Sequence, residues 1–262
     1  MDARETAQLW EGNAATWTML ARMGCDIYRN HLNTPAFLAM LPDVAGLEGL
    51  DVGCGEGYNT RQVAALGARM TALDVAPTFL REAAESEIEE PLGIRYVHAS
   101  GLELPFRAEA FDFVMATMSL MDMPEQDQAL REAHRVLKPG GFLQFSILHP
   151  CFSTPLFQSV RDENGEKIGV ICGDYFAEEQ GFVEEWIFGE TPAEMRADLP
   201  KFRVPRFDRT LSWWLNTLLD AGFALERFLE PTADEETLRK CPHLADTKIV
   251  AYFLHVRCRK PM

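Results

Sequence analysis

Short apolar runs alternate with amphipathic stretches through the middle of the chain. The apolar runs predict five strands, at 47–52, 68–75, 94–99, 111–118 and 142–148. The stretches between them predict helices at 59–66, 77–90 and 125–137. The 111–118 run is almost continuously apolar, as in a strand buried on both faces of a sheet. The alternation predicts an α/β fold with a mostly parallel sheet and helices on both faces.

The pattern changes after Pro150. The segment 151–207 contains five glycines and several aromatic residues without a helical period, so we expect loops and short antiparallel strands inserted after the fifth strand. Beyond it the chain predicts a helix at 209–221 and strands at 223–229 and 247–257. We therefore divide the chain into an N-terminal helical segment, a core, an insertion and a C-terminal part that completes the core, at 1–46, 47–150, 151–207 and 208–262.

Charge and composition narrow the possible partners. The chain has 25 Lys and Arg against 40 Asp and Glu, a formal net charge of −15, which disfavours nucleic acid or an anionic membrane as partner. No apolar run approaches the roughly 18–20 residues of a membrane span, and the N-terminus lacks the pattern of a secretory signal. We expect a cytoplasmic protein. Its six cysteines include no C-x-x-C pair, so no metal site is expected.

The first predicted strand runs into a glycine-rich turn and then a helix. Gly53, Gly55 and Gly57 follow a G-x-G-x-G spacing, and Tyr58 stands near the place of the third glycine of a dinucleotide fingerprint, which disfavours a nicotinamide-dependent oxidoreductase. Asp74 lies 17 residues beyond Gly57, at the end of the second strand. A carboxylate there can accept hydrogen bonds from two ribose hydroxyls. The alternative for Asp74 is a helix cap or turn residue.

Several motifs in a fixed order resemble one family. Residues 50–57, 71–77, 104–106, 111–114 and 131–141 are similar to successive motifs of the Rossmann-like (class I) S-adenosylmethionine-dependent methyltransferases. The resemblance covers residues 47–148 and extends neither to the insertion nor to the N-terminal segment. It implies a Rossmann-like seven-stranded sheet with an antiparallel last strand, and S-adenosylmethionine as cofactor.

The resemblance also implies roles for single residues. Gly53 and Gly55 would carry backbone against the methionine part of the cofactor. Asp51 would orient the methionine amino group, directly or through water, and Asp74 would bind the ribose hydroxyls. Val75 would pack on adenine, and the carbonyl of Thr117 would lie near the methionine amino group. Ser100 stands where the family often has an acid, so adenine recognition is expected to differ. The candidate cofactor-binding residues are Asp51, Gly53, Cys54, Gly55, Asp74, Val75, Ser100, Gly101, Leu102 and Thr117.

Three residues at or beyond strand ends are candidates for contact with a methyl acceptor. These are His149, Asp122 and Tyr175, for which the alternatives are a structural histidine, a helix cap or loop acid, and a packing role. The Asn/Asp-Pro-Pro-aromatic run of nucleic-acid amino-methyltransferases is absent after the fourth strand. We expect a small-molecule acceptor, a monomer or homodimer, and a lid formed by 151–207. The alternative is a non-catalytic regulatory protein that binds S-adenosylmethionine.

Overall fold

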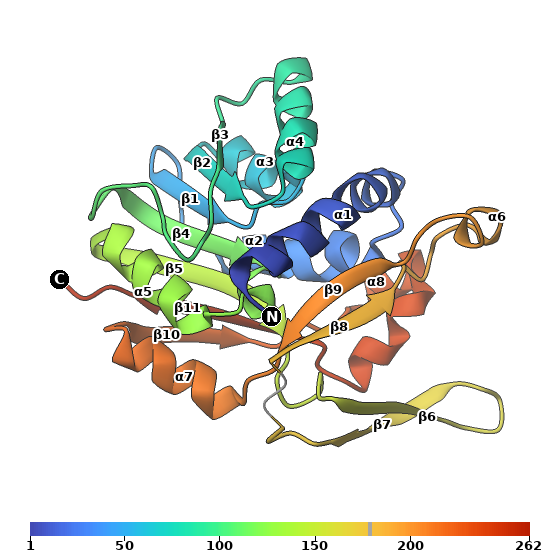
Figure 1. The fold of residues 1–262 in the computed structure, drawn as a ribbon. Helices are drawn as coiled ribbons and strands as arrows, with labels where there is room; N and C mark the ends of the chain where they lie inside the picture. Colours follow the sequence, from blue (N-terminus) through green and yellow to red (C-terminus); the bar gives the residue numbers. More distant parts are fainter. Residues whose placement is uncertain (178–179) are drawn as a thin grey trace.

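The computed structural model describes residues 1–177 and 180–262, so residues 178 and 179 of the expected insertion lie outside the described part. In this part a seven-stranded sheet has the order β10-β11-β5-β4-β1-β2-β3 (Figure 1). Its strands are β1 (Glu48–Val52), β2 (Arg69–Asp74), β3 (Arg95–His98), β4 (Phe111–Thr117), β5 (Leu137–Leu148), β10 (Ala224–Leu229) and β11 (Phe253–Arg259). The first five pair in parallel, and β11 runs antiparallel to both β5 and β10. The predicted α/β fold with an antiparallel last strand is confirmed.

Helices cover both faces of the sheet (Figure 1). On one face α5 (Gln126–Val136) and α7 (Leu211–Asp220) share a hydrophobic core with Val114 and Ala116 of β4. On the other face α2 (Thr34–Met40) and α3 (Tyr58–Ala65) share a second core with Phe113 and Met115 of the same strand. Successive residues of a strand point to opposite faces, so the apolar run of β4 serves two cores. The remaining helices are α1 (Ala3–Arg22), η1 (Arg29–Asn33), α4 (Pro77–Glu89), η2 (Leu120–Asp122), α6 (Ala193–Arg196), α8 (Glu235–Lys240) and η3 (Pro242–Lys248).

The segment between β5 and α7 contains two antiparallel strand pairs. The strands are β6 (Leu156–Arg161) with β7 (Lys167–Gly173), and β8 (Gln180–Trp186) with β9 (Phe202–Phe207). Helix α1 lies beside β9 (Figure 1), where the Asn13 side chain donates to the Arg203 carbonyl and accepts from its N–H, both at 2.9 Å. Trp17 of α1 packs on Phe202 with ring centroids 4.7 Å apart. Helix α1 therefore packs against the inserted β8–β9 pair, and we call α1 together with the inserted strands the cover.

Two predicted strand starts are wrong by five residues or more, whereas the other strand ends differ by no more than two residues. The fifth strand begins at Leu137 rather than at 142, because Gly140 and Gly141 exchange backbone hydrogen bonds of 2.9 and 2.8 Å with Lys260 and so stay in the sheet. The last strand begins at Phe253 rather than at 247, because residues 242–248 form a 3₁₀ helix. Its Thr247 hydroxyl donates to Leu244 and accepts from the Ala233 N–H, which holds this segment away from the sheet.

Candidate functional site

A cavity of about 750 Å³ opens beyond the carboxyl ends of β1, β2 and β4. The glycine turn after β1 and the segment after β4 line one side, and residues of α1, β8 and β9 line the other. Ligands of open α/β sheets bind at this edge, and the volume lies in the range of small-ligand sites. The cover formed by α1 and the inserted strands therefore meets the ligand-binding edge of the core.

The glycine turn requires glycine at Gly53. Its φ is +77°, and a Cβ there would lie 2.5 Å from the Cβ of Ser119, which follows β4. The backbone N–H groups of Gly53 and Cys54 both donate to the Leu73 carbonyl at 2.9 Å, which fixes the turn against β2. Gly53, Cys54 and Gly55 line the cavity, so the turn presents backbone to a ligand.

The Asp74 carboxylate stabilises this turn through hydrogen bonds and also lines the cavity. Its Oδ2 accepts from the Gly55 N–H and its Oδ1 from the Ala76 N–H, each at 2.9 Å. Each carboxylate oxygen has a second lone pair, so both can still accept a ribose hydroxyl. Burial raises the pKa of Asp74, and these backbone hydrogen bonds lower it. Val75, the next residue, lines the cavity too.

The turn after β3 provides a close-fitting wall. Ser100, Gly101 and Leu102 line the cavity, and the Ser100 hydroxyl oxygen accepts from the Leu102 N–H at 3.1 Å. A Cβ on Gly101 would lie 2.7 Å from a methyl carbon of Val52 and 3.0 Å from the terminal carbon of Met123. Only glycine fits this position, and the Ser100 hydroxyl keeps its proton for donation to a ligand.

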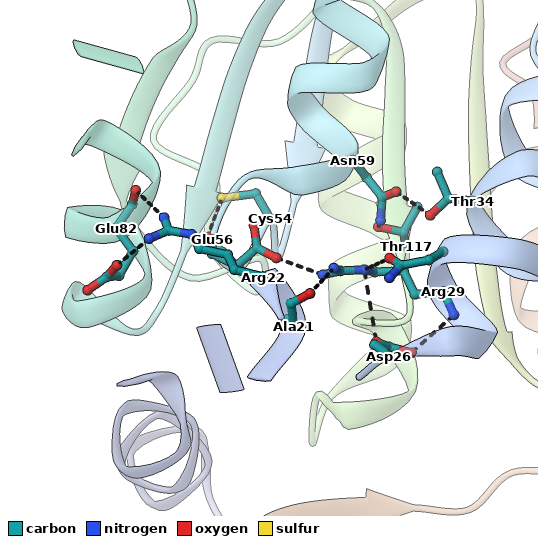
Figure 2. A network of polar contacts seen from close by, with 12 residues as sticks. Ala21, Arg22, Asp26, Arg29, Thr34, Cys54, Glu56, Asn59, Glu82 and Thr117 are labelled. Carbon is teal, nitrogen blue, oxygen red and sulfur yellow. Dashed lines mark hydrogen bonds and ion pairs between the residues drawn. The ribbon is translucent and has the colours of Figure 1, made fainter. Parts of the chain in front are cut away.

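Asp51 is not among the described residues that line the cavity. It is fully buried, and the Thr60 hydroxyl donates to its Oδ2 at 2.6 Å. Burial raises the pKa of Asp51 to about 7, against the lowering effect of that hydrogen bond. Asn59 does line the cavity, and it donates to the Thr117 hydroxyl at 2.8 Å and accepts from Thr34 at 2.7 Å (Figure 2). Direct contact between Asp51 and a ligand is therefore not what the geometry favours.

The sequence analysis did not identify Arg29, whose side chain is a cation beside the glycine turn and lines the cavity. The guanidinium of Arg29 lies 2.6 Å from Glu56 of the glycine turn and 4.0 Å from Asp26 (Figure 2). It also stacks 4.1 Å above the ring centre of Tyr58. All four side chains line the cavity. No motif marks Arg29, since the N-terminal segment lies outside the family resemblance, and only the fold brings it to the glycine turn.

The three acceptor-contact candidates lie in different surroundings. Asp122 is 6% exposed and lines the cavity. His149 is 3% exposed and is not among the described residues that line the cavity. Its Nδ1 accepts from the Cys151 N–H at 3.2 Å, so its Nε2 carries the proton and donates to Glu230 at 2.8 Å.

Tyr175 also has a structural position. Its hydroxyl accepts at 2.8 Å from the N–H of Leu211, the first residue of α7, and lies 4.0 Å from the Cys151 sulfur. Of the three candidates, the structure therefore brings Asp122 alone to the cavity wall among the described lining residues.

Residues 1–177 and 180–262 contain no group of three or more His, Cys, Asp or Glu side chains arranged to hold a metal ion. No helix within these ranges has both the length and the apolar character needed to cross a membrane.

Comparison with known proteins places the core in a family. Residues 50–145 match the family model described as a methyltransferase domain. A ubiquinone biosynthesis O-methyltransferase of Xanthomonas oryzae pv. oryzae is 36% identical over 108 residues, 41% of this chain and 45% of that protein. A demethylmenaquinone methyltransferase of Tropheryma whipplei is 38% identical over 123 residues, 45% of this chain and 50% of that protein. The chain thus spans about half the length of these curated relatives.

The similarity of the fold extends further than that of the sequence. A solved S-adenosylmethionine-dependent methyltransferase from Mesorhizobium loti superposes with a TM-score of 0.71 at 27% identity. The superposition covers 86% of this chain and 96% of that protein. Residues 50–145 therefore match a methyltransferase domain, and the chain has the class I Rossmann-like fold of the S-adenosylmethionine-dependent methyltransferases.

Proposed function

We propose that the protein transfers a methyl group from S-adenosylmethionine to a small-molecule acceptor. The observation that carries the proposal is the single cavity that joins the glycine turn and Asp74 to the inserted strands. The first part offers a cofactor site, and the second offers room for an acceptor. Phe157 of β6, Trp186 of β8 and Arg206 of β9 line the acceptor part.

The residues present fit the cofactor. Asp74 would hold the ribose hydroxyls, and Val75 with residues 100–102 would hold adenine. Thr117 and Asn59 would lie beside the methionine amino group, and Arg29 would pair with its carboxylate. Bound S-adenosylmethionine supplies an activated methyl group, so the protein's own contribution is to position the acceptor and exclude water.

The inserted strands would act as the cover of the acceptor. The β6–β7 pair is tied to the core by Lys167, whose ammonium donates to Asp246 at 2.8 Å and to the Tyr252 hydroxyl at 2.7 Å. These three residues line the cavity as well. A lid and an acceptor site favour an enzyme over a regulatory protein that only binds the cofactor. A cytoplasmic location and a monomeric or homodimeric state stay predictions from the sequence.

Calorimetry with S-adenosylhomocysteine tests the cofactor site. A charged hydrogen bond to ribose contributes about 1.5–3 kcal/mol, so Asp74→Ala is expected to weaken binding roughly 10- to 100-fold. The matched control is Asp112→Asn, because Asp112 pairs with Lys138 away from the cavity. Unchanged affinity in a folded Asp74→Ala protein would sink this assignment.

A second ligand tests the other end of the same site. 5′-Methylthioadenosine lacks the amino acid part of the cofactor, so Arg29→Met should weaken binding of S-adenosylhomocysteine but not of methylthioadenosine. The expected loss is about tenfold or more, the size of one charge-assisted hydrogen bond. Equal losses for both ligands would mean that Arg29 only holds the glycine turn through Glu56.

A further inference from the structure

Four charged residues gather on the cavity wall where the core meets the inserted strands. We call them the Asp122 cluster: Asp122 of η2, Glu184 of β8, Arg206 of β9 and Asp208 just after β9. Arg206 lies 2.7 Å from an oxygen of Asp208 and 3.3 Å from one of Glu184. It also donates to the Ser153 carbonyl at 3.0 Å. The one guanidinium of the cluster is therefore already shared between two other carboxylates.

Asp122 has no such partner. Within residues 1–177 and 180–262 no group forms a hydrogen bond with its carboxylate, although the residue is 94% buried. Burial raises its pKa well above the usual range, Arg206 lowers it, and Glu184 raises it further. A buried carboxylate without a hydrogen bond is costly, and such groups in a cleft are candidates for ligand contact.

The local fold does not need the Asp122 carboxylate. The η2 turn is fixed by Gln126, whose side-chain NH₂ donates to the carbonyls of Met121 and Phe207, both at 3.0 Å. Met123, the residue after Asp122, packs against the glycine turn, with its terminal carbon 3.9 Å from where a Cβ of Gly53 would lie. Asp122 therefore stands beside the cofactor crevice and faces the part of the cavity covered by β8 and β9.

The charge of the whole cavity points to the kind of ligand. Among the described lining residues, eight are Asp or Glu and four are Lys or Arg. The acids are Asp26, Glu56, Asp74, Asp122, Glu184, Glu190, Asp208 and Asp246, and the bases are Arg29, Lys167, Arg206 and Arg209. The excess of carboxylates favours a positively charged ligand and disfavours an anionic one. Aromatic residues, among them Phe207 and Trp214, also line the cavity, and aromatic rings suit a cation.

We propose that Asp122 binds the basic nitrogen of the methyl acceptor, and that the acceptor is therefore a small amine. The inference rests on the proposed methyltransferase function and adds the class of acceptor. An amine enters as its ammonium ion and gives one proton to the carboxylate of Asp122. The freed lone pair forms the new N–C bond while the C–S bond breaks and its electron pair stays on sulfur. The positive charge of the sulfonium thus ends on the methylated nitrogen.

The chemistry of this step explains the surroundings of Asp122. A buried carboxylate that lacks hydrogen bonds holds a proton more strongly than an exposed one, so it is a better base toward an ammonium ion. Glu184 and Asp208 engage Arg206, which keeps that guanidinium from forming an ion pair with Asp122. The carboxylate therefore stays available to the acceptor.

The test uses matched sets of small molecules. Each set holds an alkyl or arylalkyl amine, the alcohol or phenol, and the carboxylate with the same carbon skeleton. They are incubated with the full chain and S-adenosylmethionine, and formation of S-adenosylhomocysteine is measured. We expect turnover with amines and none with the matching alcohols, phenols and carboxylates. Turnover confined to alcohols or phenols, or none with any amine while S-adenosylhomocysteine still binds, overturns the amine inference and leaves the cofactor site standing.

Variants then test the role of Asp122. Asp122→Asn should lower kcat/KM for the amine by about 10²- to 10⁴-fold and leave the affinity for S-adenosylhomocysteine within twofold. Asp122→Glu keeps the carboxylate and should recover part of the rate. Asp127→Asn is the matched control, since the Asp127 side chain is 44% exposed and pairs only with Arg131 in the described structure. Full amine turnover by a folded Asp122→Asn protein refutes the inference about Asp122. If the wild-type protein does not bind S-adenosylhomocysteine, the proposed function itself is refuted.

Discussion

The buried carboxyl group of Asp51 makes the stability of the fold depend on pH, and Asp51→Asn should remove that dependence. Burial raises the folded-state pKa of Asp51 to about 7, whereas an unfolded aspartate titrates near 3.8. Between these values the folded chain keeps a proton that the unfolded chain has lost. The contribution of Asp51 to the unfolding free energy therefore falls by about 1.4 kcal/mol per pH unit as pH rises through this window. Across the window this amounts to about 4 kcal/mol.

Asparagine has the same size as aspartate and no charge, and it can still accept the Thr60 hydrogen bond. We expect the variant and the wild type to have similar stability at pH 4, and the variant to be more stable by about 4 kcal/mol at pH 8. Urea unfolding of the cofactor-free protein, followed by tryptophan fluorescence across this range, measures the difference. Thr60→Val is the control, because it removes a bond that lowers the folded-state pKa and so extends the upper end of the window. A difference that does not change with pH would refute the reasoning.

Three further outcomes are expected. Gly53→Ala should lower the unfolding free energy more than Gly55→Ala, because both glycines have positive φ but only Gly53 lacks space for a Cβ. Gly55→Ala is expected to cost about 1–2 kcal/mol. Equal losses in urea unfolding would contradict the packing argument. Lys167→Met should speed hydrogen exchange in β6 and β7 and leave the central sheet unchanged, since it removes the 2.8 Å contact with Asp246; unchanged exchange would mean that this contact does not hold the pair. His149→Gln should keep turnover within a few-fold, and a loss of about 10²-fold or more in a folded protein would support a base there instead.

Local patterns in the sequence were enough to predict the core of the fold. The period of apolar residues predicted the parallel strands and their helices, because backbone geometry repeats over two residues in strands and 3.6 in helices. The glycine turn and Asp74 could be recognised because positive φ and close backbone approach require glycine at fixed spacing. The same patterns led to wrong ends for β5 and β11, since those ends depend on pairing with Lys260 and on the 3₁₀ turn at Thr247.

Only the tertiary structure decided which polar side chains reach the cavity. Arg29 meets Glu56 across 27 positions, and Asn13 holds Arg203 across 190, so no local pattern could reveal either pair. From the sequence, His149 and Asp122 were both candidates at the ends of neighbouring strands. Their roles separate in the fold, because His149 forms hydrogen bonds with Glu230 and the Cys151 backbone, whereas the Asp122 carboxylate faces the cavity without a partner among the described residues. Burial and hydrogen bonding between distant segments determine whether a side chain is free to react, and both arise only when the chain has folded.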